Sequence, residues 1–104
     1  MNKLMFTLVL SYAYAVTNFS SAEITGKNKI AFENDYIPAC IQMQSQNALN
    51  KKFSSKEIKE YCQCASNHIV ERASVADVNG STDRLRKIIE DAGILCTGKV
   101  LMNR

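Results

Sequence analysis

The sequence predicts an all-α fold: a small three-helix bundle that two disulfides hold together. Three observations support this class. Apolar residues recur at intervals of three and four along three stretches of the chain, which is the period of an amphipathic helix. The 104 residues include one Pro and four Gly, too few turn formers for a sandwich of many strands. Four cysteines lie beyond residue 22, and an even number in a short exported chain is typical of a disulfide framework.

Residues 1–22 have the pattern of a signal peptide. Lys3 precedes an uncharged run over residues 4–16, which is shorter than the roughly 20 apolar residues that span a bilayer. Small residues favour cleavage after Ala22, with cleavage after Ala15 as the alternative. We therefore expect a periplasmic or secreted protein with no stable membrane insertion after cleavage. Residues 23–34 show no sustained apolar period, which predicts a flexible arm.

The first helix is expected from residue 35 to about residue 49. Asn34 or Asp35 can cap its start, and Pro38 suits its first turn, where a missing N–H costs little. The Gln-rich side of this helix, which includes Gln42 and Gln44, is expected to face water. The apolar positions are Ile37, Cys40, Ile41 and Ala48.

The second helix begins with the clearest local signal in the chain. Ser54 and Glu57 form a capping-box pattern, and the apolar period then runs to about Asp77. Because two residues turn a helix by about 200°, Cys64 lies nearly opposite Cys62, so this helix is expected to be covered on two sides. The predicted core positions are Ile58, Tyr61, Cys62, Ala65, Ile69, Ala73 and Ala76.

The third helix follows the turn signal Asn79-Gly80. Ser81 or Thr82 can cap its start, and Gly93 suits a left-handed stop at its end. The disulfide-stapled domain is thus expected over residues 35–96, with residues 97–104 as a tail. The core positions of the third helix are Leu85, Ile88, Ile89 and Ala92.

The four cysteines are expected to be structural. On a regular helix the sulfurs of Cys62 and Cys64 point to opposite sides, so they cannot join each other and can each reach a different helix. Two pairings stay open: Cys40 to Cys62 with Cys64 to Cys96, or Cys40 to Cys64 with Cys62 to Cys96. Each bridge is expected to stabilise the fold by about 3 to 4 kcal/mol in the chain-entropy model.

The charged residues suggest one candidate binding surface. Residues 23–104 hold 12 basic and 10 acidic side chains, a net charge of +2 that is too small to direct binding by itself. The scarcity of aromatic residues and the acidic residues between the basic ones disfavour nucleic acid as a partner. Lys51, Lys52 and Lys56 cluster in the turn before the second helix, and they form the candidate surface for binding another protein.

A chemical role for the cysteines is the alternative interpretation. The motif Cys62-x-Cys64 can serve thiol exchange or bind a soft metal, and His68 follows Cys64 at a metal-ligand spacing. A partly exposed structural role is favoured for His68, because it is the only His and no carboxylate cluster surrounds it. We therefore expect no catalytic residue, no metal or other cofactor, and no enzyme activity.

The segment Tyr61-Cys62-Gln63-Cys64, with Cys40 before it and Cys96 after it, resembles a group of small exported bacterial α-helical proteins that are mostly uncharacterised. This resemblance covers residues 35–96 and implies a helical fold and an exported location. In length, leader and cysteine content the chain also resembles the Kik-type accessory or killing proteins of conjugative plasmids. The expected function is that of a protein-binding module in a bacterial envelope system, such as conjugation, killing or toxin and immunity. Its partner would be an envelope or effector protein.

Overall fold

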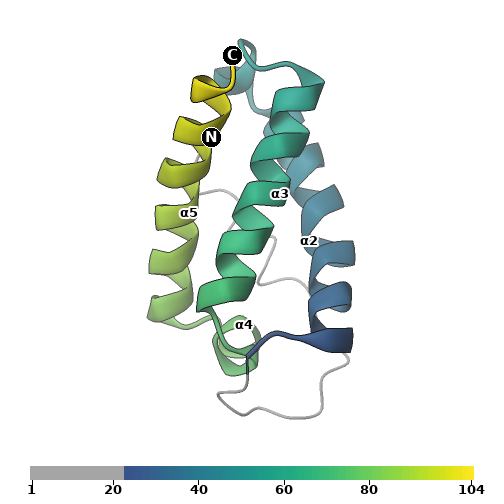
Figure 1. Ribbon diagram of the computed structural model, residues 1–104, viewed down its shortest axis with the longest axis vertical. Coiled ribbons are helices and arrows are strands. Elements are labelled where there is room, and N and C mark those ends of the chain that lie inside the picture. Colours follow the sequence, from purple (N-terminus) through teal and green to yellow (C-terminus); the bar gives the residue numbers. More distant parts are fainter. Residues whose placement is uncertain (1–22) are drawn as a thin grey trace.

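The computed structural model describes residues 23–104, so the predicted signal peptide and both of its cleavage positions lie outside the described residues. The chain forms three long α-helices, α2 (Gly26–Gln46), α3 (Ser55–Arg72) and α5 (Asp83–Met102). A short helix, α4 (Val75–Gly80), connects α3 to α5, and a 3-10 helix, η1 (Ala48–Asn50), follows α2. Within residues 23–104 no β-strand occurs, so the predicted all-α class is confirmed (Figure 1).

Helix α3 lies at the centre of the bundle and packs against α2 on one side and α5 on the other (Figure 1). Its start is the predicted capping box, in which the Ser54 hydroxyl accepts the Glu57 N–H and the Glu57 carboxylate accepts the Ser54 N–H. The predicted core positions within α3 are buried, whereas Ala76, also predicted in the core, lies in α4 and is only partly buried. The buried core positions of α3 are Ile58, Tyr61, Cys62, Ala65 and Ile69, and those of α5 include Leu85, Ile88, Ile89 and Ala92.

The predicted flexible arm over residues 23–34 is wrong. Helix α2 begins at Gly26, and the residues before it are held by a buried Ile24 and by a bridge between Glu23 and Ser74. Phe32 is 1% exposed, and its ring stacks on that of Tyr36 one helical turn later, with centroids 5.1 Å apart. These two aromatics extend the apolar side of the helix towards its start, beyond the stretch in which the sequence period is regular.

The early start of α2 also changes the setting of Pro38. This residue lies in the middle of the helix, rather than in its first turn, and its side chain faces solvent. Because Pro has no N–H, one backbone hydrogen bond of the helix is absent there. Tertiary packing by the aromatic residues on the opposite side and by the disulfide at Cys40 holds the helix across this point.

The predicted continuation of the second helix to Asp77 is wrong, because the chain starts a new helix first. Helix α3 ends at Arg72, and Ser74 caps α4. The Ser74 hydroxyl accepts the Asp77 N–H at 3.1 Å, while the Asp77 carboxylate accepts the Ser74 N–H at 3.0 Å. This second capping box competes with helix continuation, since it satisfies the backbone donors of a new first turn.

The predicted stop at Gly93 and the predicted tail over residues 97–104 are also wrong. Helix α5 continues through Gly93 to Met102, and both Cys96 and Val100 are buried. A Cβ at position 93 would lie 3.4 Å from the Tyr61 hydroxyl, which is an ordinary van der Waals contact. Among residues 23–104, none of the helices combines the length and apolar character needed to cross a bilayer.

Two disulfides join the three long helices in the first of the two open pairings. Cys40 of α2 bonds to Cys62 of α3, and Cys64 of α3 bonds to Cys96 of α5. The Cα atoms of the two pairs are 5.8 and 5.7 Å apart, which is the ordinary separation for a disulfide. The two cysteines of α3 thus fasten different neighbours, as their positions on opposite sides of one helix predict.

Candidate functional site

The three lysines of the candidate surface lie at one end of the bundle, on the connection between α2 and α3. The side chains of Lys51, Lys52 and Lys56 are all exposed. The last turn of α5 reaches the same end of the molecule, so the surface combines two segments that are far apart in the sequence (Figure 1). We call this region, residues 47–60 together with residues 97–104, the basic end.

Arg104 ties the end of α5 to the lysine-bearing turn. Its Nε donates to the Glu57 carboxylate at 2.7 Å, and one Nη donates to the Lys52 carbonyl oxygen at 3.0 Å. Its guanidinium carbon also lies 5.2 Å from the centre of the Phe53 ring, within the range of a cation–π contact. Sequence reasoning missed Arg104, because it fell in the predicted tail and its ion-pair partner is 47 residues away.

Glu57 is fully engaged in holding this turn. The hydrogen bond from Arg104 and the one from the Ser54 N–H lower the pKa of the Glu57 carboxyl to about 2. Within residues 23–104 none of Lys51, Lys52 and Lys56 forms an ion pair. The acidic residue nearest to the lysines in sequence is therefore paired with Arg104, and the three lysine charges stay available to a partner.

We expect substitution of Arg104→Ala to raise the pKa of Glu57 towards the usual value of about 4.3. The Ser54 N–H remains as a donor, so the pKa should stay below that value. Because the folded pKa is lowered, the contact stabilises the fold above about pH 4.3 and is lost as the pH falls through about 2. NMR titration of the Glu57 carboxyl carbon measures the shift. The control Arg86→Ala, at the far end of α5, should leave the pKa of Glu57 unchanged. An unchanged pKa in Arg104→Ala would contradict the contact between Arg104 and Glu57.

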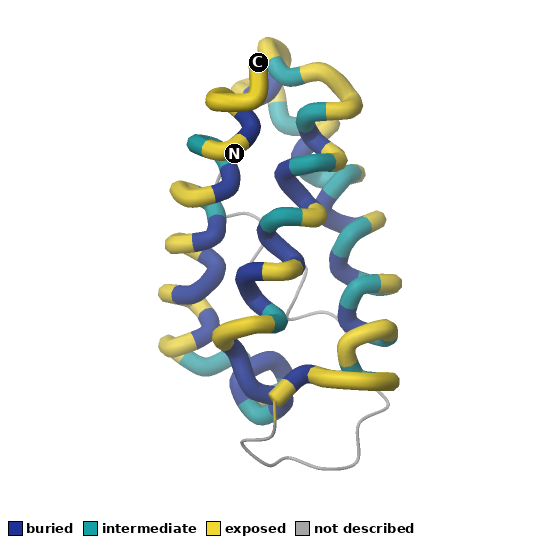
Figure 2. Tube along the Cα trace, in the orientation of Figure 1, coloured by how far each residue is buried: buried dark blue, intermediate teal, exposed yellow. Residues whose placement is uncertain are grey.

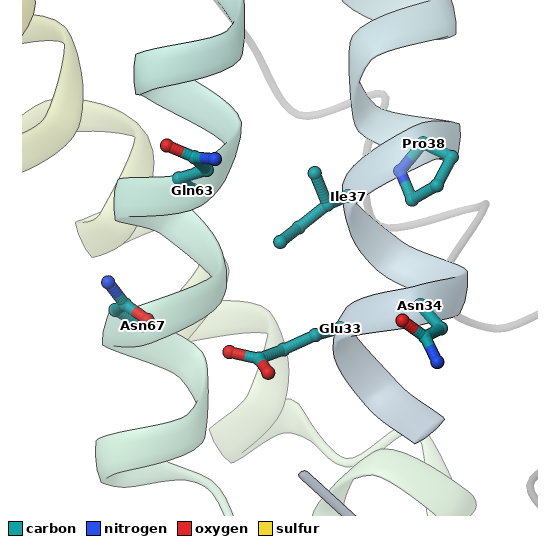
Figure 3. Close-up of a pocket in the computed structure, with 6 residues that line it drawn as sticks. All are labelled: Glu33, Asn34, Ile37, Pro38, Gln63 and Asn67. Carbon is teal, nitrogen blue, oxygen red and sulfur yellow. The ribbon is translucent and has the colours of Figure 1, made fainter. Parts of the chain in front are cut away.

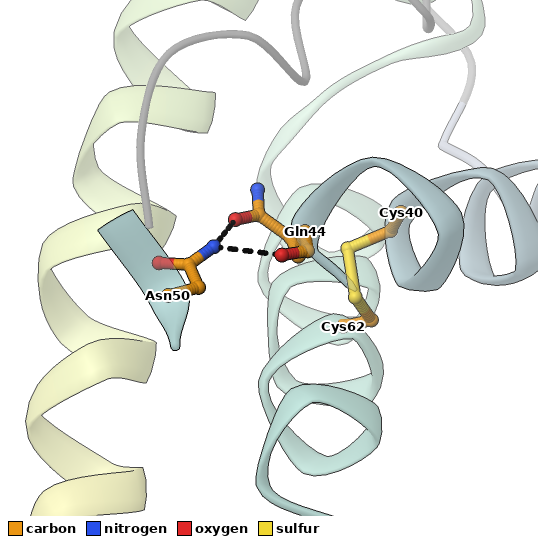
Figure 4. The surroundings of a disulfide bond; sticks show 4 residues. All are labelled: Cys40, Gln44, Asn50 and Cys62. Atoms are coloured by element: carbon orange, nitrogen blue, oxygen red, sulfur yellow. Dashed lines mark hydrogen bonds between the residues drawn. A yellow bond between two sulfur atoms is a disulfide. The ribbon is translucent and has the colours of Figure 1, made fainter. Parts of the chain in front are cut away.

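The buried carboxamides of Asn50 and Gln44 form hydrogen bonds that hold the lysine-bearing turn against α2. The Asn50 Nδ2 donates to the Gln44 carbonyl oxygen at 3.0 Å and to its side-chain Oε1 at 2.6 Å, close to the Cys40–Cys62 disulfide (Figure 4). Both residues are buried, so the expectation that Gln44 faces water is wrong. The chain reverses direction directly after α2, and this reversal brings Asn50 over the last turn of that helix. The lysine-bearing turn is thus hydrogen-bonded to the last turn of α2, which the Cys40–Cys62 disulfide joins to α3.

A shallow groove of about 500 Å³ lies between α2 and α3 (Figure 3). Ile37 projects from α2 towards α3, while Gln63 and Asn67 of α3 form the opposite wall. Most of its polar side chains are exposed. Sequence reasoning missed it because its walls come from two helices. Its lining residues are Glu33, Asn34, Ile37, Pro38, Gln63 and Asn67.

His68 differs from its prediction as a partly exposed residue. It is 8% exposed, and its Nε2 is buried without a hydrogen-bond partner. Burial, and next the nearby charge of Arg72, lower its pKa. The sulfur of Cys64 is bonded to Cys96, so the Cys64 and His68 spacing brings no thiolate to the histidine. Within residues 23–104 no three His, Cys, Asp or Glu side chains gather as metal ligands would.

Comparison with protein families, curated proteins and solved structures gives no match to this chain. The class of the protein therefore follows from its fold and its surface. It is a disulfide-bonded helical protein whose exposed basic end is held by hydrogen bonds and by the ion pair between Arg104 and Glu57. The disulfides indicate that the folded chain belongs in an oxidising environment, because the reducing systems of the cytosol keep cysteines in the thiol form.

Proposed function

We propose that this chain is a small periplasmic protein-binding module of a bacterial envelope system, acting in conjugation, killing or toxin and immunity. It works through a rigid surface and without catalysis. The observation that carries the proposal is the cluster of three unpaired, exposed lysines on an immobilised turn. The resemblance to small exported bacterial helical proteins, and in format to Kik-type proteins, supplies the setting.

Rigidity of the turn favours binding. Segments that become ordered on binding lose conformational entropy, and this loss weakens the complex. Here Arg104 holds the turn from the side of α5, and the Asn50 to Gln44 hydrogen bonds hold it from the side of α2. The lysines therefore meet a partner on a surface that is already in place.

The free charges of Lys51, Lys52 and Lys56 favour an acidic partner surface. Complementary charges speed the encounter of two proteins and reject partners of the same sign. The rival function, thiol exchange or metal carriage by Cys62 and Cys64, requires sulfurs that leave their present bonds to α2 and α5. Thiol titration of the native protein separates the two functions, since reactive thiols would favour the rival.

Reversal of two lysine charges should abolish partner contact and preserve the fold. We expect Lys51→Glu with Lys52→Glu to reduce photo-crosslinking to a discrete envelope protein by at least about tenfold, because like charges then face each other. The crosslinking probe replaces the exposed Ser55, so that all three lysines are kept in the unsubstituted protein. Crosslinking in living cells, with circular dichroism to verify folding, measures this effect.

The matched control is Lys27→Glu with Lys29→Glu. It makes the same change in net charge in the first turn of α2, at the opposite end of the bundle (Figure 1). Crosslinking should persist in this variant. Equal crosslinking by both folded variants and the unsubstituted protein would reject the lysine surface.

A further inference from the structure

Charge is unevenly distributed between the two ends of the molecule. The basic end holds six basic and two acidic side chains, a net charge of +4, while the other described residues hold six basic and eight acidic ones, a net charge of −2. The two acidic residues are Glu57, which Arg104 occupies, and Glu60, which lines a surface hollow with Lys99. The basic side chains are Lys51, Lys52, Lys56, Lys59, Lys99 and Arg104.

The basic end also carries exposed apolar side chains. Ion pairs with an acidic protein would not require them. Leu49 is 80% exposed, Met102 is 85% exposed and Leu101 is 45% exposed. Leu49 lies in η1 and the other two lie in the last turn of α5, and these two segments lie at the same end of the bundle (Figure 2). Large apolar side chains at an exposed tip, surrounded by basic ones, are typical of proteins that bind at a membrane surface.

We propose that the basic end binds the surface of a bilayer that contains anionic lipids. The lysine ammonium groups bind headgroup phosphates, and Leu49 and Met102 enter the boundary between headgroups and acyl chains. The inference goes beyond the proposed function, because it gives the module a lipid surface that orients it before it meets a protein partner.

The exposed apolar side chains of this end, which an acidic protein surface does not explain, fit a lipid surface. Leu49 and Met102 are both highly exposed, so a protein partner would need matching hollows for them. A bilayer accepts protruding apolar and basic side chains in any lateral arrangement. The attachment is interfacial only, which agrees with the finding that no helix within residues 23–104 could span the hydrocarbon.

The test is co-sedimentation of the oxidised protein, in the form that cells export, with two kinds of vesicle. One kind is phosphatidylcholine alone, and the other is phosphatidylcholine mixed with phosphatidylglycerol. Binding is expected only to the mixed vesicles and should weaken as salt is added, since salt screens the lysine charges.

Two variants and one control identify the contact. Lys51→Glu with Lys52→Glu should weaken binding at least about 30-fold, the ratio that corresponds to about 1 kcal/mol for each of two basic residues near an anionic surface. Leu49→Ser with Met102→Ser should weaken it at least about tenfold. The control, Lys27→Glu with Lys29→Glu, has the same net charge as the first variant and should bind as the unsubstituted protein does.

Three results with the vesicles would overturn the inference. They are equal binding to both kinds of vesicle, an equal loss in the Lys27 and Lys29 control, and retained binding in the Leu49 and Met102 variant. Lysine-dependent capture of poly-glutamate without any vesicle binding would also overturn it, in favour of an acidic protein. The proposed function is tested separately, because Leu49→Ser with Met102→Ser keeps all three lysines and should still crosslink to the envelope protein.

Discussion

Replacement of Cys40 and Cys62 together by alanine is expected to lower the free energy of unfolding by about 3 to 4 kcal/mol. The bridge closes a separation of 22 residues and joins α2 to α3. Its removal therefore releases chain entropy in the unfolded state, and a domain of this size has little buried surface to offset the loss. Both cysteines are completely buried, so the substitution also removes packing contacts in the core.

Chemical denaturation followed by circular dichroism measures this change. The matched variant, Cys64→Ala with Cys96→Ala, opens a separation of 32 residues and should lose a similar amount of chain-entropy stabilisation. Cys64 is only partly buried, so less packing is lost there. Should the fully reduced protein unfold at the same denaturant concentration as the oxidised one, the disulfides do not support the fold.

The second large effect is expected at Asp77, whose substitution by alanine should destabilise the protein by about 2 to 3 kcal/mol. The buried Asp77 carboxylate accepts hydrogen bonds from the Ser74 N–H at 3.0 Å and from the Thr82 hydroxyl at 2.9 Å, and it pairs with Arg84. Its loss removes the carboxylate half of the α4 capping box and leaves these donors without their acceptor. Asp83→Ala is the matched control, because the Asp83 side chain is 95% exposed and should contribute within about 0.5 kcal/mol.

The contribution of Asp77 should also depend on pH. Burial by itself raises the pKa of this carboxyl, but the hydrogen bonds from Ser74 and Thr82 and the charge of Arg84 together hold it below its usual value. A lowered pKa in the folded state means that the stabilisation is present above about pH 3.9 and is lost as the pH falls through the folded value. Chemical denaturation over a pH series measures the gap in the free energy of unfolding between Asp77→Ala and the unsubstituted protein. This gap should narrow as the pH falls. A gap independent of pH would contradict this assignment.

The elements that the sequence predicts correctly are those whose signals are local. The Ser54 and Glu57 box starts α3, Thr82 caps α5, and the spacing of three and four places Ile58, Ile69 and Leu85 in the core. The opposite placement of two cysteines on one helix likewise follows from helical geometry. Only the choice between the two pairings needed the folded structure.

The errors arise where tertiary contacts override local preference. A glycine inside a helix costs about 1 kcal/mol relative to alanine, and this cost suggested a stop at Gly93. The disulfide at Cys96 and the burial of Val100, both beyond Gly93, outweigh this cost, so α5 continues. Burial of Gln44 depends on Asn50 after a chain reversal, and the rigid turn depends on Arg104, 47 residues from Glu57. The lysines could be found from sequence, whereas the contacts that immobilise them could not.

The two disulfides also determine how a stretching force would pass along the molecule. Cys62 and Cys64 are separated by Gln63 alone, so a covalent path runs from Cys40 through this short link to Cys96. Tension applied at residues 23 and 104 follows that path and bypasses residues 41–61 and 65–95. The part of the chain under tension, residues 23–40, 62–64 and 96–104, is then roughly 100 Å long when fully extended. The reduced chain between residues 23 and 104 would be roughly 280 Å long at about 3.4 Å per residue. Most of α3 and α5, together with the lysine-bearing turn, carries no tension while both bridges stay closed.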